Sequence, residues 1–146
     1  MELTPTVEQA IVDALVDLLQ DLPEIVTACD GRVTPFSEQE LPAANVFTPK
    51  VDANEAGTLQ IDHDLAVSIV LYVAERTAQK VIRSLVSKVY AAIGQAERDS
   101  AGPLGLPQVI SINDPSKAVK CIQQGDFIGS AQIALNITYR TARWAM

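Results

Sequence analysis

The only histidine in the chain, His63, stands between two carboxylates in the run Asp62-His63-Asp64. A histidine in contact with a carboxylate is a common general acid–base pair in enzymes. The residues around His63 alternate between apolar and polar, which predicts a strand, and neighbouring side chains on a strand point to opposite faces. Neither aspartate can therefore orient the imidazole. We expect His63 to be an ordinary side chain at the solvent-exposed end of a core-facing strand.

Other kinds of catalytic chemistry lack residues at the required spacing. Cys29 and Cys121 are the two cysteines, and a nucleophilic thiol would need His63 as its base, which nothing in the sequence brings near either one. Their separation is also unlike that of metal ligands. Prolines interrupt the stretch around Gly102 and Gly105, so it is not a phosphate-binding loop. The sequence therefore predicts no enzyme, no cofactor and no metal site.

The composition is that of an ordinary soluble domain, with 48% hydrophobic and 20% charged residues among 146. This length predicts one domain over residues 1–146 that buries about two-thirds of its unfolded surface. No apolar run reaches the ~20 residues of a membrane-spanning helix, and the acidic start differs from a basic signal peptide. We expect no membrane association and a reduced, cytoplasmic setting.

The charge is distributed unevenly along the chain. The net charge of −7 argues against nonspecific nucleic-acid binding. Residues 1–64 hold 13 acidic and two basic residues, whereas residues 65–146 hold five acidic and nine basic ones. Two interpretations stay open. The asymmetry would suit head-to-tail association of copies, but folding could also mix the two halves and erase it.

Two long stretches, residues 59–74 and 127–141, alternate strictly between apolar and polar side chains. Such alternation predicts strands of an antiparallel sheet with one covered face and one wet face. Asp62 and Asp64 fall on the polar face of the first strand. The apolar face of the second carries Phe127, Ala131, Ile133, Leu135, Ile137 and Tyr139. Because strands usually have ~5–6 residues, these lengths suggest a sheet that extends toward neighbouring subunits.

Two amphipathic helices are predicted, at residues 5–21 and 75–97. The first helix has two possible N-caps. Thr4 could cap it, with Pro5 as the first helical residue, or Thr6 could cap it in a capping box with Gln9. The second has apolar residues at i, i+3, i+4 and i+7, and a basic stripe lies almost opposite them. That stripe consists of Arg76, Lys80 and Arg83.

The remaining segments are shorter. We expect a short strand at 32–34, a strand at 43–48, a polar loop at 50–58, and a rigid Gly/Pro connector at 102–107. Strands at 109–113 and 117–124 follow, and Gly125-Asp126 turns the latter into the final strand. This order predicts an α+β fold in which an antiparallel or mixed sheet of about 4–6 strands carries both helices on one face.

The order and spacing of these segments resemble those of phage tail terminator proteins, also called tail completion or minor tail protein U-like proteins. The resemblance extends over nearly the whole chain. It rests on the N-terminal helix, the acidic loop with Leu41-Pro42 before the strand at 43–48, the long strand, the second helix and the Gly/Pro connector. It also rests on the closing strand Ile137-Thr138-Tyr139-Arg140-Thr141.

The resemblance implies a structural protein of the virion tail or neck, assembled in the host cytoplasm. Terminators form a homo-oligomeric ring, usually of six copies, on the last ring of the tail tube. They stop tube polymerisation and present a surface to the head completion or stopper protein. DNA would be only cargo passing through the lumen. Two alternatives stay open: another small neck or tube-like subunit, and a small α+β ligand-binding domain or enzyme.

On this interpretation, particular residues are candidates for each surface. Asp62 and Asp64 would belong to a lumen wall that repels DNA. The basic stripe would face either a neighbouring subunit or only water. Docking contacts would come from residues 50–58 and from Arg140, Arg143 and Trp144, since Trp and Arg are enriched at the centres of interfaces.

Overall fold

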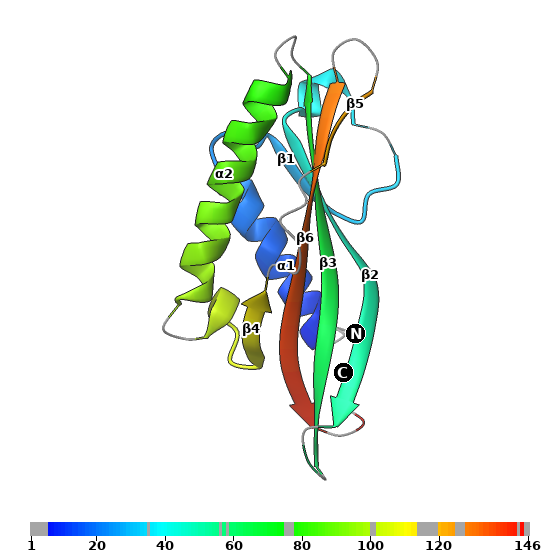
Figure 1. Cartoon of the computed structure of the whole chain (residues 1–146), viewed down its shortest axis with the longest axis vertical. Coiled ribbons are helices and arrows are strands. Elements are labelled where there is room, and N and C mark those ends of the chain that lie inside the picture. Colours follow the sequence, from blue (N-terminus) through cyan, green and yellow to red (C-terminus); the bar gives the residue numbers. More distant parts are fainter. Residues whose placement is uncertain are drawn as a thin grey trace, which may run out of the picture.

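A computed structural model describes residues 6–34, 36–55, 57, 59–74, 78–99, 102–113, 120–124, 128–142 and 144. The helices are α1 (Val7–Gln20) and α2 (Ala78–Glu97), with single 3-10 turns η1 (Glu38–Glu40) and η2 (Pro103–Gly105). The strands are β1 (Thr27–Asp30), β2 (Ala43–Glu55), β3 (Gln60–Ala74), β4 (Val109–Asn113), β5 (Lys120–Gln124) and β6 (Ile128–Ala142). Both helices lie against the sheet, which confirms the predicted α+β class (Figure 1).

The sheet is mixed. Its strand order is β1-β2-β3-β6-β4, and β5 also pairs with β6. β1 runs parallel to β2, whereas every other pair in the described sheet is antiparallel. β4 pairs with residues 136–139 of β6 and β5 with residues 128–132, so both lie along the edge of β6 that faces away from β3. The predicted Gly125-Asp126 turn and Phe127 lie outside the described residues.

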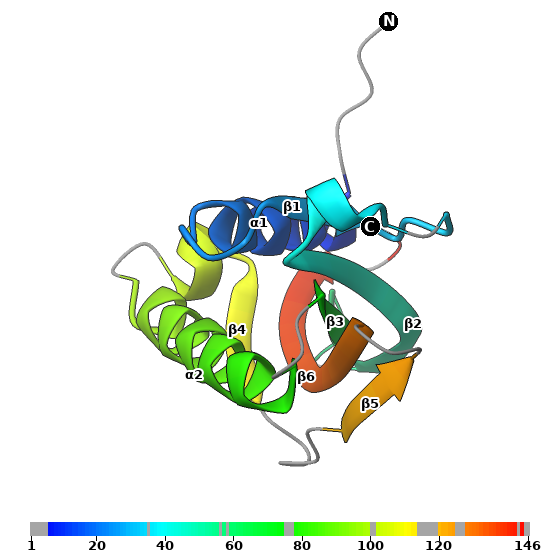
Figure 2. The ribbon, with the colours of Figure 1, turned by 90° about the horizontal axis from the view of Figure 1, so that it is seen from above.

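The long β3–β6 pair is the centre of the sheet. Its register runs unbroken from Gln60↔Ala142 to Ala74↔Ile128. Alternate residues of both strands are buried under the helices, as the periodicity predicts. Viewed along the strands, the sheet is strongly twisted, with α1 and α2 against the same side (Figure 2).

β2 is longer than predicted. We expected a strand at 43–48 and a polar loop at 50–58, but β2 continues to Glu55, paired with β3 up to Ile61. The register shifts between Phe47 and Lys50, around Pro49, and residues 49–54 are all exposed. This half of the strand buries no face, so its side chains do not alternate, and pairing with β3 alone keeps it extended. The predicted loop is therefore mostly strand.

The short strand predicted at 32–34 is also wrong, because the strand β1 ends at Asp30. Gly31 has a φ of 60°, a left-handed conformation that turns the chain out of the strand. After that turn, the buried side chain of Asn45 holds the backbone of Arg32. Arg32 N–H donates to Asn45 Oδ1 over 2.9 Å, and Asn45 Nδ2 donates to Arg32 C=O over 2.7 Å. Side-chain hydrogen bonds thus replace strand pairing here.

The helices cover neighbouring parts of the sheet. α1 packs on β1 and β2, and α2 packs on β3 and β6. α1 starts after Thr6, whose Oγ1 accepts from Gln9 N–H over 3.1 Å, while the alternative cap at Thr4 lies outside the described residues. The largest buried side chains include Ile11, Leu15, Leu19, Leu65, Ile69, Leu71, Ile82, Ile133 and Ile137. The core therefore lies between the helices and the β3–β6 pair.

Candidate assembly surface

Asp62 and Arg140, for which the sequence predicted different roles, lie opposite each other on β3 and β6. Arg140 donates two hydrogen bonds to Asp62, from Nε to Oδ1 over 2.7 Å and from Nη2 to Oδ2 over 3.1 Å. This hydrogen bonding lowers the pKa of Asp62 and raises the pKa of Arg140. A lumen wall formed by Asp62 would carry a bound positive charge, so its repulsion of DNA would be weaker than the sequence suggested.

Asp64 lies on the same polar face and is bonded to both neighbouring strands. Its Oδ1 accepts from Thr138 Oγ1 on β6 over 2.8 Å, and its Oδ2 accepts from Asn54 Nδ2 on β2 over 3.1 Å. Farther along this face, Gln132 Nε2 donates to Ser68 Oγ over 2.7 Å. The polar face is therefore a set of cross-strand side-chain bonds that hold β2, β3 and β6 together.

The residues predicted for docking meet at one end of the sheet. β2 ends where Glu55 pairs with Ile61, and the neighbouring residue Gln60 pairs with Ala142 at the end of β6. The end of β2 and the end of β6 therefore lie at the same end of the sheet (Figure 1). Near this end Leu59 is 77% exposed and Trp144 is 91% exposed. We call this end of the sheet, where β2 and β6 both end, the ribbon end. Arg143, which was also predicted for docking, lies outside the described residues.

Two stretches of sheet edge have no described strand beside them. β1 covers β2 only from Ala43 to Val46, so no described strand pairs with that side of β2 from there to Glu55. On the opposite side of the sheet, β4 pairs with β6 and no other described strand. Ile110, in the middle of β4, is 46% exposed. Backbone donors and acceptors along such edges can pair with another chain.

The helices carry opposite charges on their exposed faces. Asp13 and Asp17 of α1 and Asp21 directly after it are exposed, and so are Lys80 and Arg83 of α2. The third residue of the basic stripe, Arg76, lies outside the described residues. Asp17 and Asp21 line a hollow together with Ala92, Gln95 and Ala96 near the end of α2, whereas Lys80 and Arg83 lie in the first half of that helix.

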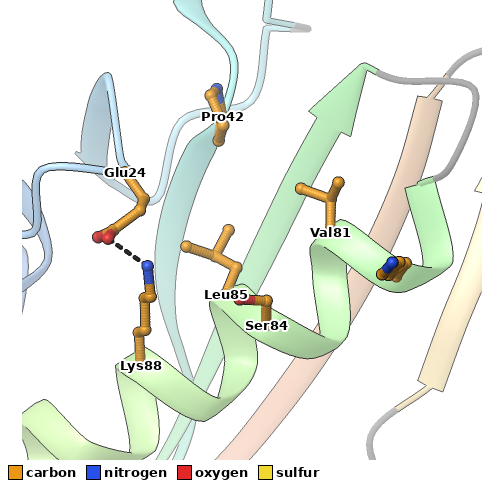
Figure 3. A pocket seen from close by; sticks show the side chains of 7 residues that line it. Glu24, Pro42, Val81, Ser84, Leu85 and Lys88 are labelled. Carbon is orange, nitrogen blue, oxygen red and sulfur yellow. Dashed lines mark hydrogen bonds and ion pairs between the residues drawn. The ribbon is translucent and has the colours of Figure 1, made fainter.

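A hollow of about 270 Å³ lies between α2 and the segment that leads from α1 to β2 (Figure 3). Its walls are mostly apolar, and seven residues line it: Glu24, Pro42, Lys80, Val81, Ser84, Leu85 and Lys88. Lys88 forms an ion pair with Glu24 across the hollow, which lowers the pKa of Glu24. Glu24 Oε2 is buried and has no hydrogen-bond partner among the described residues. We call this hollow the α2 pocket.

The α2 pocket was not predicted from the sequence, and Lys80 is its one lining residue that the sequence analysis singled out. Glu24 and Lys88 are 64 residues apart, and only the packing of α2 beside the α1–β1 connection brings them together. Pro42 lies directly before β2, whose first residue, Ala43, pairs with Tyr72 near the end of β3. Because α2 begins shortly after that end of β3, Pro42 lies near the first half of α2.

His63 has structural contacts on the core-facing side of β3. Its ring stacks on Tyr139, with ring centroids 4.7 Å apart and an angle of 11° between the planes. Its Nε2 lies 2.8 Å from Thr141 Oγ1. Asp62 and Asp64 form their bonds on the opposite face, as the alternation predicts.

Within the described residues, no group of three or more His, Cys, Asp or Glu side chains could hold a metal ion. Cys29 is a half-buried free thiol in β1, and Cys121 lies in β5. The described helices include none long and apolar enough to cross a membrane.

A second cluster that sequence reasoning missed surrounds Arg32. Its guanidinium pairs with the Glu40 carboxylate, with Nη2 3.0 Å from Oε1, and lies 4.4 Å from the ring centroid of Phe36. Phe36 in turn contacts Tyr72 of β3. The Arg32 hydrogen bond, followed by the one from the Ser37 backbone, lowers the pKa of Glu40 to about 2. These contacts fix the segment between β1 and β2 on the sheet.

Comparisons with known proteins add no identity. No protein-family model matches this chain, and no curated protein matches its sequence.

Proposed function

We propose that this chain is a phage tail terminator, a structural protein that forms a ring on the end of the tail tube. The ring would stop tube polymerisation and offer a docking surface to the head completion or stopper protein. One observation carries the proposal: the sheet has edges without a described partner strand on its two opposite sides, along β2 beyond Val46 and along β4.

A closed ring needs two different surfaces on opposite sides of each subunit, so that one copy binds the next head to tail. The two edges have this arrangement. The open part of β2 has about nine residues, roughly 30 Å at 3.3 Å per residue, which is ample for pairing with the five residues of β4. Strand addition to a sheet edge is a known mode of protein association.

The ribbon end supplies the remaining surface that the proposal needs. Exposed apolar side chains rimmed by charged pairs are typical of protein contact sites, and Leu59 and Trp144 are exposed near Asp62 and Arg140. The mechanism would be steric: the ring occupies the docking surface of the last tube ring and does not present that surface again. DNA would pass through the lumen without a specific contact.

The test uses two identical substitutions of exposed valines. Val51 lies on the open part of β2 and is 39% exposed, whereas Val33 lies outside the strands and is 95% exposed. A lysine on an edge strand discourages strand pairing. Val51→Lys is expected to abolish rings seen by negative-stain electron microscopy, and Val33→Lys to preserve them. Rings of Val51→Lys at the wild-type concentration would reject the edge contact.

A different neck or tube-like subunit would also form rings. Binding to purified tail tubes separates these functions, because a terminator should attach to tube ends and block the addition of further tube protein. A ring that leaves tube elongation unchanged would reject the terminator role.

A further inference from the structure

The walls of the α2 pocket are suited to one aromatic ring. Pro42, Val81 and Leu85 surround the hollow with apolar groups, and Leu85 is only 3% exposed (Figure 3). The pocket volume of about 270 Å³ lies below the range of about 300–1,000 Å³ that is usual for small-molecule sites. A cavity of roughly 150 Å³ already holds benzene. The hollow therefore has room for a single ring-bearing side chain.

One side of the pocket carries a hydrogen-bond acceptor without a partner. Glu24 Oε1 is paired with Lys88 Nζ, but the buried Oε2 of Glu24 has no hydrogen-bond partner among the described residues. The bond from Lys88 lowers the pKa of Glu24, so this carboxylate is charged at neutral pH. An unpaired buried acceptor is unfavourable, and the terminal torsion of a glutamate turns easily. An occupant that donates a hydrogen bond to Glu24 would remove this cost.

The neighbouring ammonium group determines which donor fits. An ammonium has three N–H groups, so Lys88 can donate to an occupant as well as to Glu24. A hydroxyl group matches this pair, because it donates to the carboxylate and accepts from the ammonium. An indole N–H only donates, a phenyl ring does neither, and Lys80 and Lys88 would repel a further cation. This side of the pocket therefore favours a phenol.

Lys80 favours an aromatic ring over an aliphatic chain. It precedes Lys88 by eight residues, which corresponds to roughly 12 Å along α2 at 1.5 Å per residue. Lys80 therefore lines the end of the pocket away from the Glu24–Lys88 pair. An ammonium group close to an aromatic ring is attracted by its π electrons. A ring whose hydroxyl points toward Glu24 thus meets both apolar walls and a cation.

The chain's own three tyrosines, all among the described residues, are occupied elsewhere. Tyr139 is 3% exposed, Tyr72 is half-buried and contacts Phe36, and Tyr90 packs against the core. The open edge of β2 and the strand β4 contribute no residue to the pocket, so the proposed ring contact leaves it open. The phenol must therefore come from a different protein.

We propose that the α2 pocket binds a tyrosine side chain of a partner protein, with the hydroxyl group bonded to Glu24 and Lys88. The inference goes beyond the proposed ring and does not depend on it, because the pocket and the ring edges share no residue. The pocket lies where β3 ends and α2 begins, so the partner docks at the end of the sheet opposite the ribbon end. A buried tyrosine in a pocket is the kind of contact that dominates interface energies.

The test compares N-acetyltyrosine amide with N-acetylphenylalanine amide, which differ only in the hydroxyl group. Each is titrated into the ¹⁵N-labelled full chain, and the backbone amide resonances are followed by NMR. The tyrosine compound should shift the amides of Val81, Ser84 and Leu85. It should bind about tenfold more tightly than the phenylalanine compound, as expected for a hydrogen bond to a charged group. Equal affinities would overturn the inference. Binding of p-cresol without binding of the tyrosine compound would also overturn it, in favour of a free phenol.

Matched variants locate the contact. Ser84 lines the pocket and Ser87 does not, although both are exposed on α2. Ser84→Phe should abolish binding of the tyrosine compound, and Ser87→Phe should behave as wild type. Glu24→Leu should make the two compounds bind equally. Unchanged binding to Ser84→Phe, or an undiminished preference for the tyrosine compound in Glu24→Leu, would overturn the inference. Ring microscopy tests the proposed function separately, and a failure of either result leaves the other intact.

Discussion

Replacing Asn45 with alanine is expected to destabilise the fold markedly, although the substitution removes only a polar group. Asn45 is 2% exposed and lies in β2. Its side-chain amide accepts a hydrogen bond from Arg32 N–H over 2.9 Å and donates one to Arg32 C=O over 2.7 Å. Asn45 is thus the residue that pairs with the backbone where strand β1 has ended.

The magnitude follows from these two hydrogen bonds. Each is worth about 0.5–1.5 kcal/mol net, and alanine leaves both backbone groups of Arg32 without their partner. We therefore expect a loss of about 2 kcal/mol in the free energy of unfolding. For a chain of this size, that corresponds to a fall in Tm of about 4–8 °C.

Urea unfolding followed by circular dichroism measures the effect, with Asn54→Ala as the control. Asn54 is an exposed residue of the same strand with one hydrogen bond, to Asp64 over 3.1 Å. A surface substitution of this kind is expected to change the stability by less than about 0.5 kcal/mol. If Asn45→Ala were as stable as Asn54→Ala, the argument that Asn45 fixes this segment to the sheet would be refuted.

Two further predictions concern charged groups. Since Arg32 lowers the folded-state pKa of Glu40 from 4.5 to about 2, this carboxylate contributes its full stabilisation above about pH 4.5 and loses it as the pH falls through about 2. Wild-type protein should therefore lose more stability over that range than Glu40→Gln, as measured by urea unfolding at each pH; parallel curves would contradict the assigned cause. Reversing the charge of Arg76, Lys80 and Arg83 together should weaken ring assembly in light scattering while leaving thermal unfolding unchanged, and undiminished assembly would exclude the basic stripe from the interface.

The long strands and the helices could be predicted because each buries one face. β3 and β6 alternate over almost their whole length, and α2 has apolar residues at helical spacing. Where no face is buried, the pattern disappears. The outer half of β2 and the four residues of β1 were therefore missed, since backbone pairing and a left-handed Gly31 determine them.

The candidate site was predictable only in part, for a related reason. The alternation placed Asp62 and Asp64 on the polar face, and composition drew attention to Trp144. The pairing of Asp62 with Arg140 depends on strand register across 78 residues. The α2 pocket depends on how a helix packs beside the segment around Glu24, and no local pattern encodes such packing.

The most direct test of the assembly account is negative-stain electron microscopy of the purified protein over a concentration series, with mass measured in parallel. The account predicts closed rings with an open lumen and a mass that is a fixed multiple of the chain. Rings that bind the end of a tail tube and stop its growth would support the terminator function specifically. Particles without a lumen, or closed dimers joined through one identical surface on each copy, would contradict the head-to-tail contact on which the account depends.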